Sequence, residues 1–151
     1  MRAKPTREAL EAFFARSGEL AGGFTGAPVP TLIECDPEAE RIVLSYDIPD
    51  WMLNPWKVMH GGLTTTLMDS AFGLLASWCN GGVMCPTVSM TTNYLRPVHA
   101  GAPLIVEARV ERFGRVNAHL SASCWQNEKL TTTATGVFST ASPRGTLLEQ
   151  G

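Results

Sequence analysis

The sequence has few charged residues and few cysteines, and both shortages limit what the protein can do. Only 17% of the 151 residues are charged and the net charge is −2. The chain as a whole therefore has no electrostatic attraction for nucleic acid. An anionic ligand must therefore be held by a local group of Lys and Arg. The four cysteines, Cys35, Cys79, Cys85 and Cys124, have neither C-x-x-C spacing nor the density of a secreted disulfide scaffold. They are typical of reduced packing residues in a cytoplasmic protein.

Long hydrophobic runs and histidine pairs are missing too. No apolar stretch reaches the roughly 18 residues needed for a membrane span, and Met1 to Leu20 has no apolar centre typical of a signal peptide. We therefore expect no membrane partner and a cytoplasmic location. His99 and His119 form no triad pattern with Ser or Cys, and no second ligand lies at metal spacing. Neither a triad hydrolase nor a metal site is predicted.

Apolar residues, by contrast, make up 44% of the chain, a high share for a monomer with so little charge, which favours an oligomer. The chain has no internal repeat or low-complexity tract, so residues 1–151 are predicted to form one domain. Thr6 precedes an amphipathic pattern typical of an N-capped helix over residues 6–17. Residues 143–151 have no periodicity and are expected to form a loose tail.

The longest predicted element is a helix that starts near Gly61 and ends before Asn80-Gly81-Gly82. At about 100° per residue, one broad face is apolar and comprises Leu63, Leu67, Met68, Ala71, Phe72, Leu74, Leu75 and Trp78. The other face is small or hydroxylic and has one carboxylate: Thr65, Thr66, Asp69, Ser70, Gly73, Ala76 and Ser77. So little charge predicts a helix buried on all sides, with a partner subunit against the small residues. Asp69 must be paired or hydrogen-bonded there.

Six segments have the composition of β-strands. Residues 31–36 and 41–47 are expected to form a hairpin, followed by an aromatic-rich loop over 48–56 that could act as a lid. Strands are also predicted at 87–96, 104–113, 116–126 and 130–140, with turns at 114–115 and 127–128 and a corner at 97–103. The clean alternation over 104–113 is typical of an antiparallel strand. The predicted fold is α+β, an antiparallel sheet wrapped around one long helix, with an additional N-terminal helix.

One motif makes this prediction more specific. His60 to Asp69 reads H-G-G-L-x-x-x-L-x-D, and it is followed by a hydroxyl at Thr87 and by N-Y-L-R-P at residues 93–97. In this element order the pattern resembles the hotdog-fold acyl-CoA thioesterases, specifically the PaaI-like branch of the 4-hydroxybenzoyl-CoA thioesterase superfamily. The resemblance covers about residues 32–139. It implies hydrolysis of an acyl-CoA thioester without a cofactor, because coenzyme A is part of the substrate.

The resemblance also implies roles for particular residues. Asp69 would act as general base, or as nucleophile through an anhydride, and the sequence leaves both open. The backbone N–H of Gly61, at the positive end of the helix, would bind the thioester oxygen. Asn54 would hold the water or the thioester, and Thr87 would orient the water. The Asn/Gly pair and the Asp/hydroxyl pair would come from different subunits, so a homodimer is the minimal unit and a tetramer of two dimers is expected.

Each assignment has a structural alternative. Asp69 could cap a shorter helix that begins at Ser70, and Asn54 could simply start a turn before Pro55. His60 is a candidate for direct chemistry, but a lone histidine before two glycines is more typical of a hydrogen-bonded structural residue. A non-catalytic acyl-CoA-binding module and a hotdog dehydratase or hydratase also remain open, although the H-x-x-x-P-G stretch of the latter is absent.

The candidates for holding the substrate are Gly62, Trp56, Met59, Arg96, Arg112 and Arg115. The arginines could bind the phosphates of coenzyme A or could be ordinary surface residues. Trp56 and Met59, together with Trp51 and Met52, could line an acyl pocket or cap the core. These side chains fit an aryl-acetyl, benzoyl or medium-chain acyl group equally well.

Overall fold

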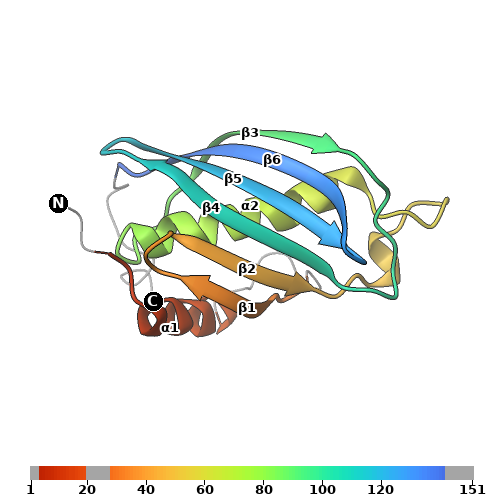
Figure 1. Cartoon of the computed structure of the whole chain (residues 1–151), viewed down its shortest axis with the longest axis horizontal. Coiled ribbons are helices and arrows are strands. Elements are labelled where there is room, and N and C mark those ends of the chain that lie inside the picture. The colour runs from red at the N-terminus through yellow and green to blue at the C-terminus, as the bar shows by residue number, and fades with distance from the viewer. Residues whose placement is uncertain (1–3, 20–27, 142–151) are drawn as a thin grey trace.

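A computed structural model describes residues 4–19 and 28–141. The elements in chain order are α1 (Arg7–Glu19), β1 (Thr31–Asp36), β2 (Arg41–Tyr46), the 3₁₀ helix η1 (Asp50–Met52), α2 (Gly61–Cys79), β3 (Thr87–Tyr94), β4 (Leu104–Phe113), β5 (Asn117–Gln126) and β6 (Lys129–Ser139). Six strands form one sheet, and α2 lies along one of its faces (Figure 1). The predicted arrangement of sheet and central helix is confirmed, whereas the expected tail at 143–151 lies outside the described residues.

All neighbouring strands of the sheet are antiparallel, in the order β1-β2-β4-β5-β6-β3. The hairpin of β1 with β2 is confirmed, and β3, which follows α2, pairs with β6 at the edge. β3 ends at Tyr94, two residues before the predicted end, because the N–H groups of Leu95 and Arg96 both donate to the Thr131 carbonyl. Asn127 and Glu128 both have positive φ, 50° and 62°, as a two-residue hairpin turn requires.

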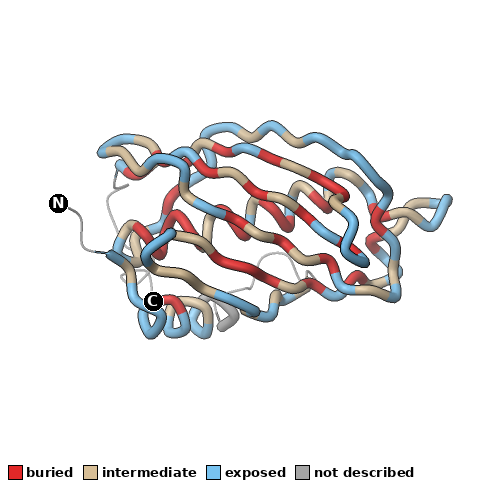
Figure 2. Tube along the Cα trace, in the orientation of Figure 1, coloured by how far each residue is buried: buried red, intermediate tan, exposed pale blue. Residues whose placement is uncertain are grey.

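The core lies between the sheet and α2, where the buried parts of both face each other (Figure 2). On β4 the predicted alternation is confirmed, since Leu104, Val106 and Ala108 are fully buried. Phe72 of α2 meets Phe138 of β6 edge to face, with ring centroids 5.8 Å apart. This packing fixes the position of α2 relative to the strands that carry the remaining site residues.

The second face of α2 is partly open in the single chain. Gly62, Thr66 and Ser70 are exposed and Asp69 is half-buried in one chain, so the burial of this face by a partner subunit stays a prediction. This face is open because the sheet covers only one side of α2. None of the described helices combines the length and apolar character needed to cross a bilayer.

Helix α1 packs beside the C-terminal end of α2. The Thr6 hydroxyl accepts a hydrogen bond from the Ala9 N–H at 3.2 Å, which confirms the predicted N-cap. Leu10 is fully buried, and the Trp78 indole N–H donates to the Thr6 carbonyl at 2.8 Å. The helix continues to Glu19, two residues beyond the predicted end.

The four cysteines all lie in the described part of the chain and form no disulfide, and Cys79, Cys85 and Cys124 are buried. Burial raises the pKa of the Cys85 thiol and raises the pKa of the Cys124 thiol to about 12. Because the thiolate is the reactive form, these cysteines have the character of packing residues and not of nucleophiles.

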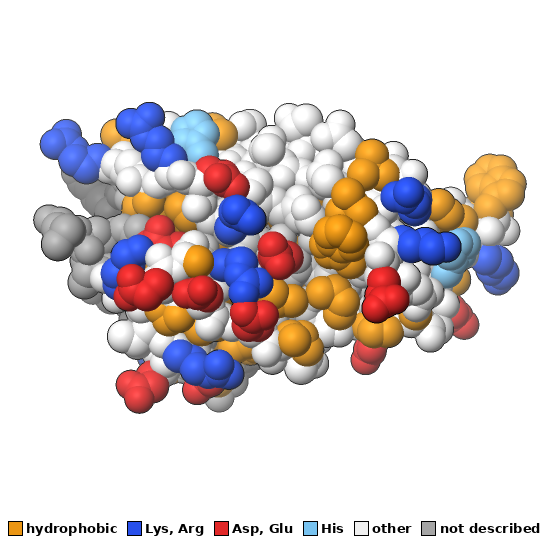
Figure 3. Space-filling view, in the orientation of Figure 1, with side chains coloured by type: hydrophobic (Ala, Val, Ile, Leu, Met, Phe, Trp, Pro, Cys, Tyr) orange, Lys and Arg blue, Asp and Glu red, His pale blue; other side chains and the backbone are white. Residues whose placement is uncertain are grey.

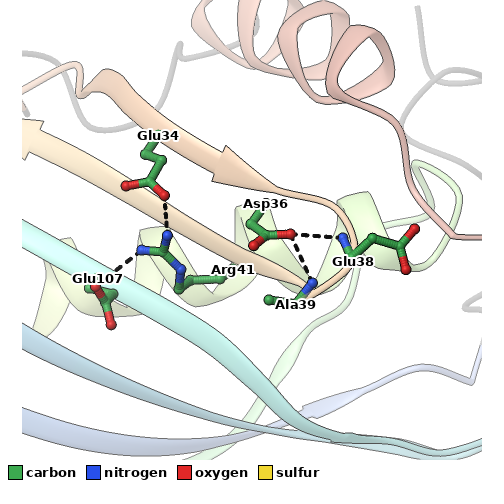
Figure 4. A network of polar contacts seen from close by, with 6 residues as sticks. All are labelled: Glu34, Asp36, Glu38, Ala39, Arg41 and Glu107. Carbon is green, nitrogen blue, oxygen red and sulfur yellow. Dashed lines mark hydrogen bonds and ion pairs between the residues drawn. The ribbon is translucent and has the colours of Figure 1, made fainter.

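The charged residues of β1, β2 and β4 gather on the face of the sheet that points away from α2 (Figure 3). Arg41 bridges Glu34 and Glu107 across three strands, and Asp36 accepts from the N–H groups of Glu38 and Ala39 in the β1–β2 turn (Figure 4). Exposed ion pairs of this kind contribute at most about 1 kcal/mol each. This network therefore helps to hold β1, β2, β4 and the β1–β2 turn in place, and we assign it no catalytic role.

Candidate functional site

Asp69 lies in the middle of α2, with its carboxylate on the partly open face. The Thr87 hydroxyl at the start of β3 donates to Asp69 Oδ1 at 2.6 Å. The structure thus brings together two of the predicted site residues, which are 18 positions apart in the sequence. Because the helix already begins at Gly61, the alternative in which Asp69 caps a helix starting at Ser70 is wrong.

Gly61 is the first residue of α2, so its amide belongs to the turn whose N–H groups have no carbonyl partner within the helix. The ring of Tyr94 packs over this glycine, and a Cβ at position 61 would lie 3.0 Å from Tyr94 Cζ. A side chain at position 61 would therefore require the Tyr94 ring to shift by a few tenths of an ångström. The Tyr94 hydroxyl donates to the Gly61 carbonyl at 2.8 Å and lies 2.6 Å from the Thr65 hydroxyl.

Tyr94 is a site residue that the sequence did not reveal. It lies within the 93–97 motif, but its contact with Gly61 joins residues 33 positions apart. The alternating faces of a strand would at best have placed it on the same side as Thr92, whose hydroxyl accepts a hydrogen bond from Thr65. Together these groups hold the first turn of α2 against β3.

A cavity of about 360 Å³ adjoins this turn. Its lining residues are Val58, Met59, Gly61, Thr64, Tyr94, Leu95, Arg96, Pro97, Val98 and Thr132. Two of the predicted substrate contacts, Met59 and Arg96, are therefore placed next to Gly61. Its lining combines apolar side chains with the polar groups of Thr64, Tyr94, Arg96 and Thr132, and a concave site with a few placed polar groups is the usual form of a small-molecule site.

The loop before α2 uses Asn54 as a turn residue. Its Oδ1 accepts from the N–H groups of Trp56 and Val58 at 3.0 and 3.2 Å, which is the structural role considered as the alternative. Met52 and Met59 are buried in the core, whereas Trp51 and Trp56 are exposed, Trp56 by 81%. Within one chain Trp56 therefore does not line the described cavity.

Four other predicted residues lie outside the lining of this cavity. Arg112 and Arg115 are exposed at the β4–β5 turn, at the opposite end of the sheet from the α2 N-terminus (Figure 1). His60 is exposed and its imidazole makes no capping hydrogen bond, but its carbonyl accepts from the N–H groups of Leu63 and Thr64. Gly62 is exposed beside Gly61 on the first turn.

Comparison with known proteins identifies the family. The family model described as the thioesterase superfamily matches residues 57–132, half of the chain, and the match includes α2, β3, β4 and β5. The chain belongs to the thioesterase superfamily. Membership confirms the resemblance inferred from the motif, and with it the predicted class of enzyme, a thioester hydrolase, at the level of the family.

Individual members of the family agree with this assignment. Acyl-coenzyme A thioesterase THEM4 of Xenopus laevis is 32% identical over 72 residues, a match that covers 48% of this chain and 32% of that protein. The chain thus spans about a third of that relative. The structure of Escherichia coli PaaI, from the phenylacetic acid degradation operon, superposes with a TM-score of 0.75 at 23% identity, over 92% of this chain and 96% of PaaI.

A second solved structure, smu.793 of Streptococcus mutans bound to acetyl-CoA, has a TM-score of 0.69 at 20% identity. The match covers 82% of this chain and 98% of that protein. At such identities the two structures confirm the hotdog fold and leave the residue roles to be tested. Among the described residues, no group of three or more His, Cys, Asp or Glu could hold a metal ion.

Proposed function

We propose that the protein is an acyl-CoA thioesterase that releases a carboxylic acid and free coenzyme A. The observation that carries the proposal is the 2.6 Å hydrogen bond between Thr87 and Asp69 on an open helix face. Accepting one hydroxyl leaves the other lone pairs of the carboxylate for a water molecule. A carboxylate and a hydroxyl that are hydrogen-bonded to each other can both contact and orient one water molecule beside them.

The proposed reaction needs no group beyond these residues, water and a backbone amide. Asp69 removes a proton from the water as its oxygen attacks the thioester carbonyl carbon, and the carbonyl becomes an oxyanion. An amide at the N-terminus of α2, that of Gly61, donates to the oxyanion. When the intermediate collapses, the carbon–sulfur bond breaks and the proton held by Asp69 passes to the leaving thiolate. In the alternative, Asp69 attacks the carbonyl itself and water hydrolyses the resulting anhydride.

One chain supplies only half of this machinery. Gly61 and Asp69 are eight residues apart on one helix, which at 1.5 Å per residue separates them by about 12 Å along its axis. Both cannot contact the same thioester carbonyl. We therefore propose that the site forms between Asp69 and Thr87 of one subunit and Gly61 and Asn54 of another, in a homodimer that can pair into a tetramer. The exposed hydroxylic face of α2 supports this assembly.

Mixing two inactive variants should restore activity if the site is shared. Asp69→Asn removes the carboxylate from one half-site, and Asn54→Ala removes the amide from the other. After dissociation and reassociation, random pairing should return up to about a quarter of the wild-type sites. Thiol release measured before and after mixing tests this, and light scattering gives the assembly. If the mixture is never more active than its components, the two halves belong to one chain.

The hydroxyl of Thr87 should contribute more to kcat than the methyl group of the same side chain does. Thr87→Val keeps the shape but removes the hydrogen bond to the carboxylate, and hydrogen bonds to charged groups correspond to about 10- to 100-fold in rate. We expect kcat to fall by that factor in Thr87→Val and to recover in Thr87→Ser. Thr91→Val, on the outer face of the same strand, is the matched control. Equal kcat values for Thr87→Val and Thr91→Val would exclude the role proposed for Thr87.

The acyl group that we propose is a small aryl or medium-chain acyl group. The cavity beside Gly61 has the volume for either, and Met59, Leu95 and Val98 give it an apolar wall. Thiol release from a panel of phenylacetyl-, benzoyl- and medium-chain acyl-CoA thioesters tests the proposal and ranks the substrates. Binding of acyl-CoA without thiol release would instead indicate a non-catalytic module. The cytoplasmic location stays a prediction.

A further inference from the structure

The first turn of α2 has a sequence that favours a helix only weakly. It begins with Gly61 and Gly62, and glycine has the lowest helix propensity after proline. The N-cap residue is His60, whose side chain makes no capping hydrogen bond. The residues at 64–66 are all threonine, and their β-branched side chains lower the helix propensity further. Because helix ends fray, a turn of this composition needs support from another element.

Tyr94, the last residue of β3, supplies this support. Its hydroxyl donates to the Gly61 carbonyl at 2.8 Å and lies 2.6 Å from the Thr65 hydroxyl. The Thr65 hydroxyl in turn lies 3.2 Å from that of Thr92, also on β3. We call these three hydroxyls, together with the Gly61 carbonyl, the Tyr94 clamp. The clamp joins the first turn of α2 to a strand that lies 27 to 33 positions further along the chain.

The clamp acts on the residue that we propose as the oxyanion donor. The peptide unit that contains the Gly61 N–H also contains the His60 carbonyl, which accepts from the N–H groups of Leu63 and Thr64 at 3.0 and 3.1 Å. The next peptide unit contains the Gly61 carbonyl, which Tyr94 holds. With the peptide units on both sides of its α-carbon held, Gly61 has a fixed N–H direction. A donor that is already oriented needs no reorganisation when the oxyanion forms.

We propose that Tyr94 is a positioning residue for thioester hydrolysis, which stabilises the oxyanion through the Gly61 amide that it holds in place. This role rests on the proposed thioesterase function. Tyr94 also lines the cavity beside Gly61, so the ring and the hydroxyl have separable tasks. The ring forms part of the acyl wall, and the hydroxyl orients the amide. An interaction that strengthens only in the transition state affects kcat and leaves substrate binding unchanged.

The two tyrosines of the chain provide a matched pair of variants. Tyr46 is buried and also donates to a carbonyl of α2, that of Leu67, at 3.3 Å. Tyr94→Phe and Tyr46→Phe therefore each remove one phenolic hydroxyl from α2, but only Tyr94→Phe releases the first turn. We expect Tyr94→Phe to lower kcat about 10-fold, the upper end of the range for one hydrogen bond, with KM within about twofold of the wild type because the ring remains. Tyr46→Phe should leave kcat within about twofold.

A variant on the helix side keeps the test valid even if Tyr94→Phe does not fold. Thr65→Val removes the hydroxyl that contacts Tyr94 and should lower kcat about 3-fold, whereas Thr65→Ser should restore it. Combined with Tyr94→Phe, Thr65→Val should add less than its separate effect, because both substitutions break the same clamp. Hydrogen–deuterium exchange of peptides from the first turn of α2 should be faster in Tyr94→Phe and in Thr65→Val, and unchanged in Tyr46→Phe.

Thiol release from acyl-CoA thioesters, measured as kcat and KM for each variant, separates this role from the function on which it rests. If the wild type releases no thiol, the proposed function fails and the role of Tyr94 fails with it. If the wild type is active and Tyr94→Phe has the same kcat as Tyr46→Phe, Tyr94 is not a positioning residue and the function stands. A rise in KM at unchanged kcat, or a fall in kcat without faster exchange in the first turn, would also overturn the role proposed for Tyr94.

Discussion

Replacing Asp69 with Asn should lower kcat for thioester hydrolysis by about 10³-fold or more, within the range that a positioned acid or base contributes. The amide has nearly the shape of the carboxylate and can still accept the hydrogen bond from Thr87, but it can neither take a proton from water nor attack a carbonyl. Because Asp69 is half-buried on an open face, the variant should fold normally. Thiol release under saturating substrate measures the effect.

Ser70→Ala is the control for this prediction. Ser70 is the next residue on the helix, is exposed, and donates only to the Thr66 carbonyl of its own helix. Its loss should leave kcat within about twofold of the wild type. If Asp69→Asn behaves like Ser70→Ala, while circular dichroism shows both to be folded, Asp69 has no part in the chemistry.

A single turnover in ¹⁸O water distinguishes the two roles of Asp69. When Asp69 acts as a base, the oxygen that enters the acid comes from water, so the first product molecule is labelled. When Asp69 attacks and water then opens the anhydride at the aspartyl carbon, the first product contains an unlabelled oxygen from the protein. Mass spectrometry of the acid formed with enzyme in excess separates these outcomes.

The sequence predicted the fold well because its signals are local. Apolar residues recur at helical spacing from Gly61 to Cys79, Asn80-Gly81-Gly82 ends that pattern, and β4 alternates cleanly. The pairing of Asp69 with Thr87 was accessible because the motif supplied both residues. The apolar periodicity and the family motif both predicted the same helix, α2, so the local sequence signal agreed with the overall fold.

What the sequence could not supply depends on contacts across the sheet. Tyr94 meets Gly61 only because β3 lies beside α2, and Gln126 reaches His99 across 27 positions. Thr66 and Ser70 were predicted to be buried against a partner subunit, and they are exposed in one chain; helical spacing identifies the apolar face of α2 but does not show what covers the other face. Arg112 and Arg115 were candidates on charge alone. They lie far from Arg96 because β4 carries the chain to the opposite end of the sheet before the β4–β5 turn (Figure 1).

Phe72→Ala should destabilise the protein by about 3 to 5 kcal/mol, the usual cost of deleting a buried phenyl ring. Phe72 is fully buried, meets Phe138 edge to face, and lies so close to Gly136 that a Cβ there would be 3.0 Å from its ring. The pairing of β6 with both β3 and β5 restrains its backbone from moving in to close the cavity that the substitution leaves. Denaturant unfolding measures the loss.

Two further variants make this prediction decisive even if Phe72→Ala does not fold. Phe72→Leu keeps most of the volume and should lower the free energy of unfolding by only about 1 to 2 kcal/mol, with the site intact. Phe14→Ala, on α1, removes a ring that is only partly buried and should cost less than Phe72→Ala. Since α2 carries both Gly61 and Asp69, loosening its contact with β6 should lower kcat as well as stability. Equal losses for Phe14→Ala and Phe72→Ala would show that the sheet does not hold α2 through Phe72.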